Sequence, residues 1–204
     1  GEIADRNKIN ISVNGETVKP FDPLFIHEID DKDGKLDENL WDGVSVKWIA
    51  RSQIIQLHPE GALTAEVCIT QLPHPPTVGN ENILPANLCR EKYMIGAGNY
   101  GFYIYRNGRL ISWADPLEMI GFGQDLYSFR GRLLLNSDAD EILSIDVTKS
   151  RILLSEIAKD QLIPLVSEAK KKSKSAWSHA SAELNKKINS DPHNSISGEL
   201  DEAS

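Results

Sequence analysis

The chain has few of the residues that build disulfide frameworks and membrane spans. It holds two cysteines among 204 residues, which cannot form the network of cross-links that stabilises small secreted domains. No run approaches 18 consecutive apolar residues, so we expect no transmembrane helix. The first seven residues lack the basic and then apolar layout of a secretory signal. These absences predict a cytoplasmic protein that makes no membrane contact.

The chain also has fewer positive than negative side chains, and the charges are unevenly distributed along it. The net charge is −8, and residues 1–42 carry 5 positive and 11 negative side chains. Residues 43–154 carry 10 and 11, residues 155–188 carry 7 and 4, and residues 189–204 carry 0 and 4. A protein that coats nucleic acid along its length would be basic throughout, so this class is excluded. The acidity of residues 1–42 and 189–204 does not describe the surface of residues 43–154, which are nearly neutral.

Strand patterns fill the first three quarters of the chain, and a helix pattern follows. Alternating residues around Asn14-Gly15 and Asn107-Gly108 predict two hairpins, over 8–19 and 100–113, because Asn-Gly favours the tightest hairpin turn. Further strands are expected over 44–57, 62–70, 127–135 and 143–147. Apolar residues at helical spacing predict a helix from Ser155 to about Ile188, in which Pro164 is a candidate kink. The fold class is therefore α+β, a mixed and mainly antiparallel sheet with a packed C-terminal helix.

The remaining segments are predicted to be irregular. Residues 28–42 form an acidic loop, and residues 73–88 form a loop with four prolines. Residues 189–204 are rich in Ser, Asn and Asp with few apolar anchors, which predicts a disordered tail.

Two motifs of nucleotide and calcium sites fail on inspection. Gly96, Gly98 and Gly101 match G-x-G-x-x-G, but they precede a strand instead of opening a helix, so we interpret them as a tight turn. A calcium loop over 29–40 would place Ile29 and Leu40 where oxygen ligands are needed. None of the five histidines has metal-ligand spacing, alone or with the cysteines, so no metal site is predicted.

The lysines between Lys170 and Lys174, close in sequence to Trp177, have two interpretations. Lysines can bind phosphate while an indole stacks on a base. Alternatively, they are the solvated end of a helix, where cations suit the helix dipole. The candidate nucleic-acid contacts are Arg106, Arg109, Arg130, Arg132, Lys170, Lys171, Lys172 and Lys174.

Four stretches together resemble one family. The hairpin from Gly101 to Ile111, with Arg-Asn-Gly-Arg at its turn, resembles a hairpin of the GHKL-type ATPases, which include gyrase B, MutL, the ninety-kilodalton heat-shock chaperone and the MORC proteins. Residues 129–135 and 143–150 resemble the two strands and the loop that follow. Residues 9–23 are similar to a hairpin near the end of the family's nucleotide domain.

The resemblance implies a transducer domain over residues 28–188, preceded by a hairpin over 1–27 and followed by a tail over 189–204. Its fold would be like the second domain of ribosomal protein S-five, with a left-handed β-α-β crossover. In the family a lysine on a transducer loop contacts the γ-phosphate of ATP bound in the preceding domain. Lys149 matches this position, which makes it the candidate catalytic and cofactor-binding residue.

The family's nucleotide-domain motifs have no counterpart here. The helical Glu-x-x-x-Asn pattern, the Asp-x-Gly-x-Gly turn and the glycine-rich lid are missing, so ATP and magnesium are expected in the intact protein only. The implied partners are a GHKL nucleotide-binding domain, a second copy in a homodimer, and DNA. We expect no ATP hydrolysis by this chain alone. A nucleic-acid-binding module and a ligand-free protein–protein interaction domain remain the alternatives.

Overall fold

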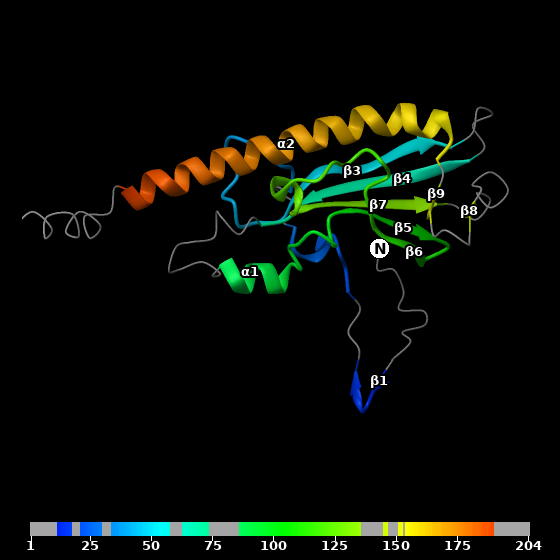
Figure 1. The fold of residues 1–204 in the computed structure, drawn as a ribbon, viewed down its shortest axis with the longest axis horizontal. Helices are drawn as coiled ribbons and strands as arrows, with labels where there is room; N and C mark the ends of the chain where they lie inside the picture. Colours follow the sequence, from blue (N-terminus) through cyan, green and yellow to red (C-terminus); the bar gives the residue numbers. More distant parts are fainter. Residues whose placement is uncertain are drawn as a thin grey trace, which may run out of the picture.

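The computed structural model describes residues 12–17, 21–29, 34–57, 63–73, 86–135, 145–146, 151–152 and 154–189. Over these residues the chain is α+β, and a long C-terminal helix lies along one side of a mixed five-stranded sheet (Figure 1). The sheet is formed by β3 (Lys47–Gln56), β4 (Thr64–Gln71), β5 (Gly101–Arg106), β6 (Arg109–Asp115) and β7 (Phe129–Leu135). The predicted α+β class with a mainly antiparallel sheet is confirmed.

The strand order is β3-β4-β7-β5-β6, so β7 lies between two hairpins. It pairs antiparallel with β4 and parallel with β5, and the other two pairs are antiparallel. The parallel pair is joined through β6 and the single-turn 3₁₀ helix η3 (Gln124–Leu126). The two edges of the sheet are therefore β3 and β6.

In β4, β5 and β7, side chains that point to the two faces of the sheet enter different environments, as the pleat requires. Val67, Phe102 and Leu133 belong to the larger core, which they share with Leu162 and Val166 of the C-terminal helix α2 (Glu156–Asn189). On the opposite face, buried apolar side chains of the sheet meet the segment 21–29, which contains the short 3₁₀ helix η1 (Ile26–Glu28), as in the cluster of Leu24, Trp48, Cys68 and Tyr103. Figure 1 shows the same two layers on either side of the sheet.

Both Asn-Gly turns form hairpins as predicted, although of the first predicted hairpin, 8–19, the structure describes only residues 12–17. Asn14 and Gly15 have φ of 52° and 85°, and Asn107 and Gly108 have φ of 48° and 74°. Positive φ at both central residues is what a type I′ turn requires, and Asn and Gly tolerate it. The first hairpin joins β1 (Ser12–Val13) to β2 (Glu16–Thr17), and the second joins β5 to β6.

The helix predicted from Ser155 onward is confirmed, and it is continuous through Pro164. Its buried stripe follows the helical period: Ala158, Leu162, Val166, Ala169, Ser173 and Ala176. Pro164 projects from the exposed face, so its ring does not disturb the packing against the sheet. The predicted disordered tail was residues 189–204; Asn189 is the last residue of α2, and residues 190–204 lie outside the described residues.

Two features were not expected from the sequence. A helix, α1 (Ala86–Lys92), begins within the segment predicted to be a proline loop. Cys89 of this helix and the following Tyr93 are buried with Phe25, Val46 and Leu72 in a second small core. Strand β3 is also irregular, because its pairing with β4 shifts register between Ala50 and Gln53 and Ser52 has a φ of 49°. This β-bulge lies on an edge strand, where bulges are common.

Candidate functional site

Lys149, the residue predicted to sense ATP, lies outside the described residues. The strands on either side of it are described. β8 (Ile145–Asp146) and β9 (Arg151–Ile152) pair antiparallel, with Ile145 opposite Ile152. Three residues then separate Ile152 from the start of α2. The candidate site is therefore the junction between this strand pair and the first turn of α2.

Side chains of the first turns of α2 attach the helix to the end of β3. The Ser155 hydroxyl caps the helix by accepting from the Ala158 N–H (3.2 Å), and it donates to the Leu57 carbonyl (2.7 Å). The Gln161 amide makes two bonds to the backbone of Gln56: it accepts from the N–H (3.0 Å) and donates to the carbonyl (3.1 Å). These bonds attach the start of α2 to the end of β3.

Further polar contacts hold the middle of α2. The Ser173 hydroxyl donates to the side-chain oxygen of Gln71 on β4, and both residues are fully buried. The Lys170 ammonium donates to the Met119 carbonyl (2.9 Å), and Lys174 pairs with Asp125 (3.1 Å). Together with the apolar stripe, these contacts hold α2 against the sheet and against the segment between β6 and β7.

The predicted nucleic-acid contacts do not gather on one surface. Arg106 and Arg109 flank the turn between β5 and β6. Arg130 and Arg132 lie on β7, on the face of the sheet opposite α2, and the four lysines lie on α2 itself. Two of those lysines, Lys170 and Lys174, are engaged in the contacts described above, and Lys172 pairs with Glu168 at 3.0 Å.

Arg130 is the clearest difference from the sequence interpretation, because its side chain is buried with an exposed fraction of 1 %. Its guanidinium donates to the carbonyls of Tyr127 (2.7 Å), Phe129 (3.0 Å), Tyr93 (3.1 Å) and Met94 (3.2 Å). Tyr93 and Met94 directly follow α1, so a cation meets the carbonyl end of that helix. Burial lowers the pKa of Arg130 to about 10, and the side chain is not accessible to an external phosphate.

Arg132 is partly exposed, and it already faces an acidic neighbour. Its Nη2 atom lies 3.9 Å from a carboxylate oxygen of Glu66 and 3.5 Å from the sulfur of Cys68 on the neighbouring strand β4. Its charge is therefore partly offset within the sheet face.

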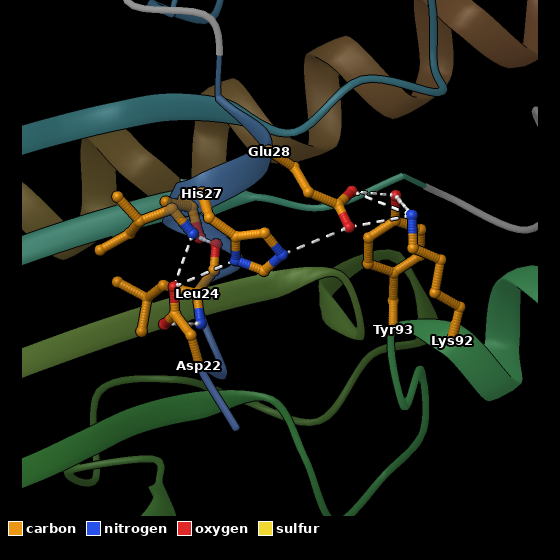
Figure 2. A network of polar contacts seen from close by, with 8 residues as sticks. Asp22, Leu24, His27, Glu28, Lys92 and Tyr93 are labelled. Atoms are coloured by element: carbon orange, nitrogen blue, oxygen red, sulfur yellow. Dashed lines mark hydrogen bonds and ion pairs between the residues drawn. The ribbon is translucent and has the colours of Figure 1, made fainter. Parts of the chain in front are cut away.

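A polar network joins the segment 21–29 to Lys92, the last residue of α1, and to the following Tyr93 (Figure 2). The Glu28 carboxylate accepts from the Tyr93 hydroxyl (2.6 Å) and from the Lys92 ammonium (3.1 Å). The Asp22 carboxylate accepts from two backbone N–H groups of the turn that follows it. Burial, followed by the hydrogen bond to Glu28, raises the pKa of Tyr93 to about 12. Tyr93 is therefore a hydrogen-bond donor near neutral pH and not a base. The network has a structural role, in which it joins Glu28 to Lys92 and Tyr93.

Neither cysteine is arranged as a nucleophile. Cys68 and Cys89 are both buried and free. Burial raises the pKa of the Cys68 thiol, and it raises that of Cys89 to about 11. Both thiols are therefore protonated near neutral pH, whereas nucleophilic attack requires the thiolate.

Sequence reasoning missed a cavity of about 510 Å³ between β3 and α2. Its charged lining residues are Lys35, Arg51, Glu168 and Lys172, of which only Lys172 was among the predicted contacts. The spacing of Glu168 and Lys172 could have indicated their ion pair, because residues four apart share one side of a helix. No local pattern could have brought Lys35 or Arg51 to the same place.

Comparison with known proteins leaves the family open. No protein-family model, curated protein or solved structure matches the chain. Within the described segments, none of the helices combines the length and the apolar character that crossing a bilayer requires.

Proposed function

We propose that the chain is the transducer region of a GHKL-type ATPase, with a fold like the second domain of ribosomal protein S-five, acting in the cytoplasm. In this role Lys149 contacts the γ-phosphate of ATP held by a separate nucleotide-binding domain, and the contact is lost when that phosphate leaves. A contact that exists in only one nucleotide state can bias two arrangements of the domains. The intact protein would act as a homodimer.

One observation supports this proposal most directly. The strand pair β8–β9 brackets the Lys149 segment and leads within three residues into α2, whose first turns are hydrogen-bonded to the end of β3. A movement of Lys149 on binding phosphate would therefore act on a helix that is hydrogen-bonded to the sheet. This is the mechanical arrangement that a transducer needs.

The test is ATP turnover by a polypeptide that carries this chain together with the proposed nucleotide-binding domain. We expect Lys149→Ala to lower turnover by about 10²-fold, because one preorganised charge on a developing phosphate is worth that much. Lys149→Arg should retain part of the activity, since the charge stays while its shape changes. Lys159→Ala, on an exposed part of α2, is the control and should have no effect.

Two results would refute the proposal. One is unchanged turnover and unchanged ATP-linked dimerisation in Lys149→Ala. The other is magnesium-dependent ATP hydrolysis by residues 1–204 alone, because a transducer region lacks the machinery for it.

The alternative, a nucleic-acid-binding module, has less support. Its cations occupy a hairpin, one sheet face and a helix on the other face, and Arg130 is buried. A salt-dependent gel shift that is lost on Arg109→Gln would favour it, because phosphate contacts release counterions.

A further inference from the structure

The connection between β6 and β7 contains strained backbone. Three of its residues that are not glycine, Ala114, Leu117 and Glu118, have φ of 48°, 51° and 59°. Residues with a Cβ rarely adopt such angles, which are costly and persist only where surrounding contacts enforce them. We call residues 114–126 the strap, which runs from the last two residues of β6 to the end of η3.

Hydrogen bonds within the strap hold its turn closed. The Asp115 carboxylate accepts from the Leu117 N–H (2.8 Å). The Pro116 carbonyl accepts from the N–H groups of Met119 (2.9 Å) and Ile120 (3.0 Å). These three N–H groups are protected from exchange with solvent while the turn is formed, so their exchange rates report the state of the strap.

Two lysines of α2 hold the strap from a different part of the chain. The ammonium of Lys170, which is half-buried, donates to the Met119 carbonyl (2.9 Å). Lys174 forms an ion pair with Asp125 (3.1 Å). Three apolar side chains of the strap are buried in the larger core that α2 also covers: Leu117, Ile120 and Leu126. The strained turn therefore keeps its conformation through contacts with the helix.

The strain and the contacts with α2 act in opposite directions. Release of the strap would let Leu117 and Glu118 return to ordinary backbone angles, whereas the lysine contacts and the apolar burial oppose release. Phe122 is 80 % exposed, so its ring contributes little burial to the attached state. A segment in which such opposing contributions meet can open without unfolding of the rest of the domain.

We propose that the strap has two arrangements, one attached to α2 and one released from it. In the attached arrangement Lys170 and Lys174 hold the strained turn on the helix. In the released arrangement these contacts are absent and the turn relaxes, so a displacement of α2 changes the conformation of the strap. This inference goes beyond the proposed transducer role, because it requires neither Lys149 nor ATP and can be tested on residues 1–204 alone.

Hydrogen exchange of residues 1–204, followed by mass spectrometry of the peptide that covers 117–120, tests the proposal. Lys170→Met keeps the apolar stem of the side chain and removes its donor, so exchange in this peptide should become about three- to tenfold faster. Lys171→Met is the matched control, because Lys171 is the next residue of α2 and is exposed. Exchange in the control should equal that of the wild type. Equal rates in both variants would overturn the proposal.

A pair of substitutions at the exposed Glu118 tests the strain separately. Both Glu118→Asn and Glu118→Gln remove the charge, but asparagine tolerates positive φ better. Exchange over 117–120 should therefore be about two- to fivefold slower with asparagine than with glutamine. Glu118→Asn should also offset part of the acceleration caused by Lys170→Met, because both substitutions act on the same equilibrium.

Two further results would overturn the proposal. One is equal exchange over 117–120 in the asparagine and glutamine variants, because the turn would then not be strained at Glu118. The other is an acceleration in Lys170→Met that is as large in β4 as in the strap, because it would report unfolding of the whole domain and not release of one segment.

Discussion

Replacing Arg130 by methionine would keep most of the apolar volume and remove four donated hydrogen bonds. Leaving a buried carbonyl without its donor typically costs about 1–3 kcal/mol. The Met94 carbonyl also accepts from the Asn99 side chain (3.0 Å), so one of the four acceptors keeps a partner. We therefore expect the lower end of this range for each of the other three, a total loss of about 3 kcal/mol of the free energy of unfolding. For a chain of this size, that loss lowers the Tm by roughly 6–12 °C.

Urea denaturation followed by circular dichroism measures this loss. Arg130→Lys should also be destabilising, because one ammonium cannot reproduce a planar fork that reaches several carbonyls. The control is Arg109→Met at the exposed hairpin turn, which should change the stability by no more than about 0.5 kcal/mol. If Arg130→Met lost less than about 1 kcal/mol, the carbonyls after α1 would not need this donor, and the reasoning would be refuted.

Three further predictions concern single positions. Gly101→Ala should lower the free energy of unfolding by about 2 kcal/mol or more in thermal melting, because φ is +125° and a Cβ would lie 2.8 Å from a backbone carbonyl oxygen. Gly98→Ala is the control and should be nearly neutral, because a Cβ there meets open space. Equal effects of the two substitutions would contradict this reasoning. Ser155→Ala removes the N-cap of α2 and its bond to Leu57, so we expect the free energy of unfolding to fall by about 1 kcal/mol. Hydrogen exchange in the first turn of α2 should become faster, and unchanged exchange would argue against the cap. The pKa of Tyr93 is raised from 10.0 to about 12, so the stability contributed by its protonated phenol is complete below pH 10 and is lost between about pH 10 and 12. In an alkaline absorbance titration, Tyr93→Phe should remove one tyrosine that titrates late. Loss of a tyrosine that titrates near pH 10 would contradict the shift.

Much of the fold was predictable because its signals are local. The Asn-Gly turns require only the conformational tolerance of two residues, and both hairpins form around them. The helix was readable because its apolar residues recur at the helical period from Ala158 to Ala176. The short helix α1 was not predicted, because seven residues carry little periodic signal and its stability comes from burying Cys89 and the adjacent Tyr93.

The candidate site was predictable only in part. The assignment of Lys149 stays a prediction, because that residue lies outside the described part of the chain. The bonds between α2 and β3 were not predicted, since Ser155 and Leu57 are 98 positions apart. The cavity between β3 and α2 depends on a bulge at Ser52 and on a bridge between Lys35 and Trp48. Both arise from long-range strand pairing, which no short pattern encodes.

The sequence by itself determined where strands, turns and the long helix lie, because backbone preference and hydrophobic period act over a few residues. It also determined that Arg130 and Arg132 alternate with apolar residues and so share a face of β7. Only the tertiary structure decided that the residues after α1 and the turn at 127–128 cover Arg130, while Arg132 stays partly exposed beside Glu66. The reason is that alternation assigns a residue to a side of a sheet, whereas the cover on that side comes from distant parts of the chain. For the same reason, only the tertiary structure placed Lys35, Arg51 and Lys172 around one cavity.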